Sequence, residues 1–169
     1  MGKKKYVAYV GTYTHGSSKG IQVYDVNVEE GTLKERSQVK VSNASYTAIS
    51  KNGKFLYSIE DEGVAVFERD ENGDLTRINS VDIDGMRGCF LATDVDGKYL
   101  YVAGYHDGKV TVVHTHRDGR LGSVMDGVFH KGLGSVAERN FRPHVNCVRP
   151  TPDNKYLCAV DNGIDQVKV

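Results

Sequence analysis

The sequence has no tryptophan, and its 169 residues include only 3 cysteines and 3 prolines. The cysteines, Cys89, Cys147 and Cys158, are too few and too far apart for a disulfide scaffold or a CxxC metal site. No secretory hydrophobic region follows the N-terminal lysines, and no long apolar run occurs elsewhere. These absences argue against export and against a membrane-spanning helix, and they predict a cytoplasmic protein.

Charge of one sign is also missing, because 22 Lys and Arg residues balance 22 Asp and Glu residues. No basic run alternates with aromatic residues, so we expect neither nucleic acid nor a membrane as a partner. The sequence has no phosphate-binding glycine loop, no serine nucleophile motif and no histidine–carboxylate metal spacing, so we expect no cofactor and no metal. His114 and His116 share one face of an expected strand, and a half-exposed sheet surface explains this pair better than a zinc site.

The sequence is rich in glycine, with 19 residues, and several of them recur at a fixed interval. Gly53 and Gly97 are 44 residues apart, and Gly63 and Gly108 are 45 apart. This period in strand-rich sequence is typical of β-propeller blades. No Trp-Asp dipeptide occurs, so the WD40 type is excluded. The next interval is longer because residues 122–143 contain an insertion.

Alternating apolar and polar residues divide each repeat into strands joined by Gly, Asn and Asp turns. The pattern predicts an all-β protein made of four-stranded antiparallel blades, with no helix outside the insertion. We expect one partial propeller domain over residues 1–169. Its expected parts are strands two to four of a first blade at about 6–41, a second blade at about 45–84, a third at about 89–130, and strands one to three of a fourth at about 144–169.

Several ordered motifs resemble a known family. They are "GTYT" with "KGIQVYDV", "NASYTAISKNGKFLYS", "GKYLYVAGYHDGKVTVV" and "PHVNCVRPTPDNKYLCAVDNGIDQVKV". Together they resemble the lactonase family of seven-bladed propellers, which includes a bacterial propeller-type 6-phosphogluconolactonase and, more distantly, a fungal carboxy-muconate lactonizing enzyme. The family usually has His-Pro-His where this chain has His144-Val145-Asn146, so Asn146 replaces the second histidine.

The resemblance implies that the chain matches about the first half of a family member, an incomplete arc of about three and a half blades out of seven. An open arc exposes strand edges that promote aggregation. We therefore expect the missing C-terminal half of the propeller, or an edge-pairing neighbour, to cover these edges. We also expect the 169-residue piece alone to be inactive, because its channel is only half walled.

Polar residues are expected to gather at one mouth of the channel, where the inner strands start and the second strands turn into the third. A lactonase needs a base to activate water, donors for the oxyanion and a cation for a phosphate or carboxylate. The candidate catalytic residues are His144 as base or proton shuttle, Asp161 as its orienter and His106 as an auxiliary donor or acceptor. The candidate substrate-binding residues are Arg142, Arg87, Asn146, Tyr105 and Glu60.

Simpler interpretations stay open for three of these residues. His106 is equally explained as a turn residue packed against Tyr105, Asp161 as a carboxylate that binds backbone amides at a strand end, and Arg142 as a solvated loop charge.

The expected function is hydrolysis of a sugar lactone, 6-phosphogluconolactone to 6-phosphogluconate in the pentose phosphate pathway, by activated water. The alternatives are a non-catalytic propeller that binds a partner and a carboxy-muconate-type lactonizing cycloisomerase. Fold alone does not distinguish these functions.

Overall fold

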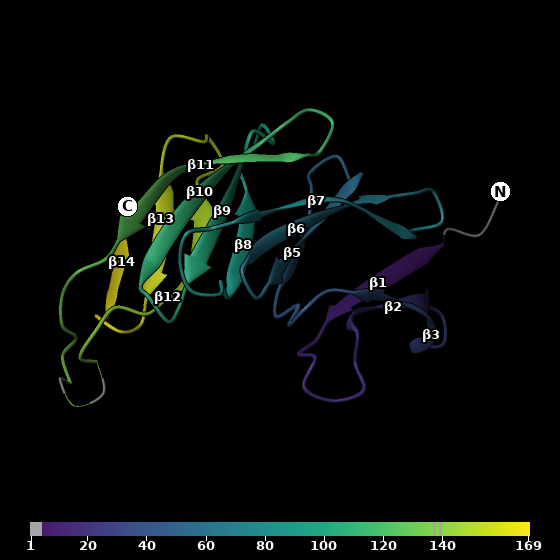
Figure 1. Ribbon diagram of the computed structural model, residues 1–169, viewed down its shortest axis with the longest axis horizontal. Helices are drawn as coiled ribbons and strands as arrows, with labels where there is room; N and C mark the ends of the chain where they lie inside the picture. Colours follow the sequence, from purple (N-terminus) through teal and green to yellow (C-terminus); the bar gives the residue numbers. More distant parts are fainter. Residues whose placement is uncertain (1–4, 137, 139) are drawn as a thin grey trace.

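The structure is a computed structural model that describes residues 5–136, 138 and 140–169. Within them, fourteen β-strands form four antiparallel sheets of three, four, four and three strands, and no helix is present (Figure 1). In each sheet the strands lie side by side in chain order. The prediction of an all-β arc of antiparallel propeller blades is therefore confirmed. The part of the insertion that the structure describes continues a strand and then forms a loop.

The strand bounds follow the repeat. The first sheet contains β1 (Tyr6–Gly11), β2 (Gly20–Asn27) and β3 (Thr32–Lys40). The second contains β4 (Thr47–Ile49), β5 (Phe55–Glu60), β6 (Gly63–Arg69) and β7 (Leu75–Asp82). The third contains β8 (Phe90–Thr93), β9 (Tyr99–Gly104), β10 (Lys109–Thr115) and β11 (Leu121–Phe129). The fourth contains β12 (Val145–Pro150), β13 (Leu157–Asp161) and β14 (Gln166–Lys168).

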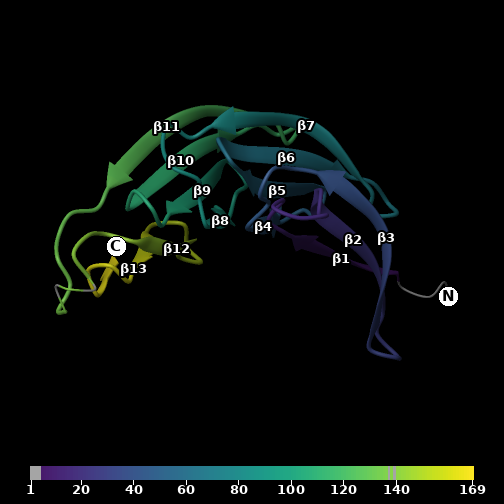
Figure 2. The same cartoon turned by 60° about the horizontal axis from the view of Figure 1, so that its bottom comes forward.

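The sheets form an arch. Figure 2 shows β7 and β11 along its outer side and β4, β8 and β12 beneath them on the inner side. The chain ends lie at opposite ends of the arch (Figure 1). β4 contacts β8, and β8 contacts β12, so the inner strands of successive sheets are neighbours. Residues at the two ends of these strands therefore gather on two opposite faces.

The hydrophobic core lies between the sheets, which explains why β5 is buried along almost its whole length. Leu56 packs toward the first sheet, in a cluster with Ile21 and Val41. Tyr57 and Ile59 pack toward the third sheet. Because both faces of the second sheet are covered, apolar side chains alternate between two interfaces rather than between core and solvent. Each fully buried aliphatic side chain contributes about 1.5–3 kcal/mol to folding.

Candidate functional site

The candidate site lies where the third and fourth sheets meet, on the face formed by the starts of the inner strands. Asp161 ends β13, and its carboxylate is almost fully buried, with the residue 1% exposed. Its Oδ1 accepts hydrogen bonds from the backbone N–H of His144, at 2.8 Å, and of Gly163, at 3.0 Å. The structure thus shows the backbone-binding role for Asp161, and this role fixes the main chain of His144.

The His144 ring has a defined orientation. Its Nδ1 lies 2.7 Å from the carbonyl oxygen of Tyr105. The imidazole also stacks on the Tyr105 ring, with the two ring centroids 4.3 Å apart. A carbonyl oxygen only accepts hydrogen bonds, so Nδ1 must carry a proton. In the neutral ring the lone pair is then on Nε2. Nε2 is therefore the atom of His144 that can take a proton from water.

His130 is a further member of this cluster, and the sequence analysis missed it. Its Nδ1 lies 2.7 Å from Asp161 Oδ2, and its side chain is only 5% exposed. Its backbone N–H donates to the Gly108 carbonyl at 2.8 Å, which ties it to the turn between β9 and β10. Because Asp161 Oδ1 already binds two N–H groups, the carboxylate joins His130 to the main chain of His144. His130 directly follows β11, at the repeat position that Val41 and Ile83 occupy after β3 and β7. Because those two residues are apolar and buried, the repeat gave no signal for a polar group here.

Gly163 allows the backbone of this cluster to pack closely. A Cβ atom at this position would lie 2.1 Å from the Arg142 carbonyl oxygen and 2.6 Å from the His144 nitrogen. Any side chain here would push the segment that carries His144 away from Asp161.

Three other predicted residues lie near this cluster but make fewer contacts. His106 is exposed, and its ring meets Tyr105 edge-on at 5.6 Å, as expected for a turn residue packed against that ring. Arg142 is exposed, and its guanidinium lies 5.7 Å from the centre of the Phe141 ring. Asn146 is exposed on β12, at the irregular register between Val145 and Cys147.

Arg87 belongs to a different cluster on the same face. Its guanidinium donates to Asp61 Oδ1 at 3.0 Å and lies 5.1 Å from the centre of the Tyr13 ring. Asn43 also donates to Asp61 Oδ1, at 2.7 Å. The hydrogen bond from Asn43, and then the pairing with Arg87, lower the pKa of Asp61 below its usual range. The negative charge of Asp61 thus holds Arg87 against the β5–β6 turn of the second sheet, beside the Tyr13 ring.

Glu60 is not part of either cluster. Both of its carboxylate oxygens accept hydrogen bonds from one nitrogen of Arg77, at 3.0 and 2.8 Å, so it pairs with the outer strand β7 of its own sheet.

A partly buried thiol and a buried ammonium group lie beneath this face. The Cys89 Sγ donates to the Val145 carbonyl at 3.4 Å, and burial raises the pKa of its thiol, which disfavours a nucleophilic thiolate. Lys109 is buried, and its Nζ donates to the carbonyls of Ile83 and Asp84, each at 2.9 Å. These contacts hold the β9–β10 turn against the segment that precedes β8.

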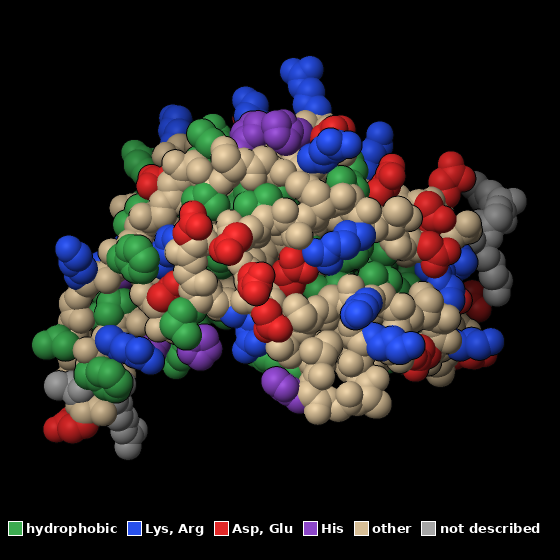
Figure 3. Space-filling view, viewed as in Figure 1, with side chains coloured by type: hydrophobic (Ala, Val, Ile, Leu, Met, Phe, Trp, Pro, Cys, Tyr) green, Lys and Arg blue, Asp and Glu red, His purple; other side chains and the backbone are tan. Residues whose placement is uncertain are grey.

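The surface carries both signs of charge. Acidic and basic side chains are interspersed on the face drawn in Figure 3. Among the described residues, no group of three or more His, Cys, Asp or Glu side chains is arranged to hold a metal ion. The same residues contain no helix that could cross a membrane.

Successive antiparallel sheets of three or four strands, with their inner strands as neighbours, are the arrangement of β-propeller blades. A model of the family described as "Lactonase, 7-bladed beta-propeller" matches residues 7–169. The chain therefore belongs to the lactonase family of seven-bladed propellers, and the resemblance seen in its motifs is confirmed.

Individual relatives agree with this assignment. The chain is 40% identical over 169 residues to a Bacillus subtilis protein named 6-phosphogluconolactonase, an alignment that covers 96% of this chain and 48% of the relative. A crystal structure from Bacteroides fragilis, described as a candidate 6-phosphogluconolactonase, is 39% identical with a TM-score of 0.90 and covers 98% of this chain and 48% of that one. A Pseudomonas aeruginosa structure, named a periplasmic gluconolactonase, is 31% identical with a TM-score of 0.90, covering 97% and 49%. The chain thus spans about half the length of these relatives.

Proposed function

We propose that a complete propeller containing this chain hydrolyses a sugar lactone, 6-phosphogluconolactone, to 6-phosphogluconate, as a step of the pentose phosphate pathway. Family membership and the names of the relatives support this class of reaction. One observation assigns the reaction to the cluster around His144. Its Nδ1 contacts the Tyr105 carbonyl oxygen, which leaves Nε2 to act as a base. The cytoplasmic location stays a prediction, and the Pseudomonas relative is named periplasmic.

The proposed reaction uses water and no redox step. His144 Nε2 takes a proton from a water molecule while the water oxygen forms a bond to the lactone carbonyl carbon. The bond between that carbon and the ring oxygen then breaks, and the ring oxygen receives the proton from Nε2. The net change is addition of one water to the ester. Asp161 and His130 hold His144 in place, and Arg142, exposed beside the site, is the proposed contact for the substrate phosphate.

We also propose that the site needs more of the ring than this chain supplies. The first and fourth sheets have three strands each, against four in the second and third. When the sheets surround only one side of the channel mouth, water reaches the site. Water weakens the electrostatic interactions between the site and its substrate. The remaining half of a propeller, or an edge-pairing neighbour, is the proposed cover for the open strands.

The test compares a complete propeller that contains these residues with residues 1–169 alone. Each is assayed for acid release from 6-phosphogluconolactone and from the same lactone without its phosphate. We expect the complete protein to hydrolyse the phosphorylated lactone with a kcat/KM at least about tenfold higher, because a charge-assisted contact is worth about 1.5–3 kcal/mol. We expect the 169-residue chain to show no turnover above background.

Two results would contradict these proposals separately. A folded complete protein that hydrolyses neither lactone would exclude the reaction and favour a binding module. A stable monomer of residues 1–169 with the turnover of the complete protein would leave the reaction standing and exclude the need for a cover.

A further inference from the structure

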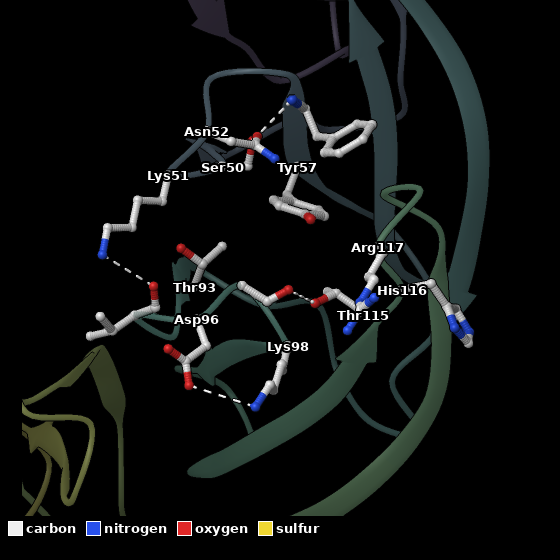
Figure 4. A pocket seen from close by; sticks show the side chains of 13 residues that line it. Ser50, Lys51, Asn52, Tyr57, Thr93, Asp96, Lys98, Thr115, His116 and Arg117 are labelled. Carbon is white, nitrogen blue, oxygen red and sulfur yellow. Dashed lines mark hydrogen bonds and ion pairs between the residues drawn. The ribbon is translucent and has the colours of Figure 1, made fainter.

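A cavity of about 600 Å³ lies on the other face of the molecule, between the second and third sheets (Figure 4). Its walls come from the turn between β4 and β5, from β5 itself, from the turn between β8 and β9, and from the end of β10. The lining residues used below are Lys51, Tyr57, Thr93, Asp96, Lys98 and Arg117. These turns lie at the opposite ends of the strands from His144. The volume is in the range of small-molecule sites.

Tyr57 presents its hydroxyl to this cavity. The residue is 3% exposed, and among the described residues no partner forms a hydrogen bond with its hydroxyl. Burial, followed by the nearby Asp94 carboxylate, raises the pKa of Tyr57 to about 12, so the group stays protonated at neutral pH. Asp94 itself accepts bonds from the backbone of Lys98 and Tyr99 and from Asn154. The hydroxyl opens to the cavity and has no partner within the described residues, so it can donate to an acceptor on a ligand there.

The charges around the cavity favour an anion. Lys51, Lys98 and Arg117 line it, against Asp96 as the one lining carboxylate among the described residues. Asp96 lies 3.7 Å from Lys98, which leaves the other two cations without an ion pair in the described structure. Lys51 donates to the Val95 carbonyl at 3.2 Å, a contact that fixes its position without neutralising its charge.

The cavity also adjoins the inner strands. Thr93 lines it and lines a second cavity, of about 310 Å³, that runs along β4, β8 and β12. Arg149 lines this second cavity, with its guanidinium 5.4 Å from the centre of the Phe90 ring. A further cation therefore lies on the side of Thr93 that faces the inner strands.

We propose that the cavity between the two turns binds a small organic anion that carries carboxylate or phosphate groups, with Tyr57 and Arg117 as direct contacts. The Tyr57 hydroxyl donates to one anionic oxygen, and the Arg117 guanidinium supplies paired N–H donors to others. The site is separate from His144, so it does not depend on the proposed hydrolysis.

The experiment measures anion binding to a complete propeller that contains this chain, by calorimetry. Inorganic pyrophosphate and citrate are the probes, and they distinguish a phosphate site from a carboxylate site. We expect at least one to bind with a Kd below about 1 mM. Tyr57→Phe and Arg117→Gln should each raise that Kd about fivefold or more, because each removes one direct donor while keeping most of the side chain's bulk.

The chain offers matched controls. Tyr101 is the repeat counterpart of Tyr57 on β9, and Arg120 lies in the same turn as Arg117; neither lines the cavity. Tyr101→Phe and Arg120→Gln should leave the Kd within about twofold. The proposal is overturned if neither anion binds, or if binding survives both Tyr57→Phe and Arg117→Gln in folded protein. It is also overturned if binding is lost only in His144→Gln, which would place the anion at the other face.

Discussion

Asp161 binds two different parts of the candidate site with its two carboxylate oxygens. Oδ1 binds the backbone of His144 and Gly163, and Oδ2 binds the imidazole of His130. Since all these partners donate hydrogen bonds, the carboxylate is satisfied as an anion without any further partner. A buried charge held in this way has little freedom to move, which makes Asp161 a rigid support for His144.

This arrangement predicts a positioning role for His130. In the complete protein, His130→Leu should lower kcat for the lactone about ten- to hundredfold, because a small misplacement of His144 is costly. KM should stay within about threefold. His130→Asn should recover most of the lost kcat, since its amide N–H can still donate to Asp161. Kinetics on both variants, with thermal melting to confirm folding, test this.

A role limited to stability would give a different pattern. Equal losses in His130→Leu and His130→Asn, or unchanged kcat in folded His130→Leu, would contradict the positioning role.

Some residues of the candidate site could be predicted from the sequence, and others could not. His144 and Asp161 lie at the start and end of strands in the repeat, so period and strand order placed them together. His130 occupies the repeat position of the buried apolar residues Val41 and Ile83, so the repeat pattern indicates a core side chain there. The group that orients His144 is the Tyr105 carbonyl, a backbone atom that residue types do not reveal. The pairing of Glu60 with Arg77 depends on how two long side chains extend across one sheet, which strand alternation does not determine.

At the scale of the strands, the first three sheets have an irregular strand pairing at the same position of the repeat. The register shifts after Val23 in β2, after Val66 in β6 and after Val112 in β10, where each pairs with the outer strand. A bulge of this kind increases strand twist and bends the outer edge. The positions and order of the strands could be predicted from alternation and glycine turns, but these shifts could not, because they depend on backbone pairing.

The loop between β11 and β12 is held by Asp165, in the turn between β13 and β14. Its carboxylate accepts bonds from the Ser135 backbone at 2.6 Å, from the Ser135 hydroxyl at 2.7 Å and from Asn140 at 2.8 Å. These bonds, with the Ser135 backbone first, lower the pKa of Asp165. The carboxylate of Asp165 therefore holds the loop fully above the pKa of an aspartate in the unfolded chain, about 3.9. This stabilisation is lost as the pH falls through the lower pKa of Asp165 in the folded protein.

We therefore expect the Ser135 amide signal to be constant from about pH 7 to 5 and to change with a midpoint below about 3.9. A pH titration followed by NMR measures this directly. Asp165→Asn, which cannot ionise, is the control and should abolish this transition. A midpoint at or above about 3.9 would show that the carboxylate is not held as described.

At the scale of the whole molecule, the arch separates two polar regions at opposite ends of its strands. One contains His144, Asp161 and His130, and the other is the cavity beside Tyr57 and Arg117. The inner strands that connect them line the second cavity. Two regions built from different loops on one rigid scaffold can differ in function, as is common for propellers and other repeated folds.

The most direct test of the account is the lactone turnover of His144→Ala in a complete propeller. The account predicts a fall in kcat of about two to four powers of ten, the usual contribution of a general acid–base residue. His114→Ala, a histidine on β10 that contacts Tyr99 and His116, is the matched control and should keep kcat within about twofold. A folded His144→Ala protein with the kcat of the unmodified enzyme would contradict the assignment of the base and, with it, the central claim.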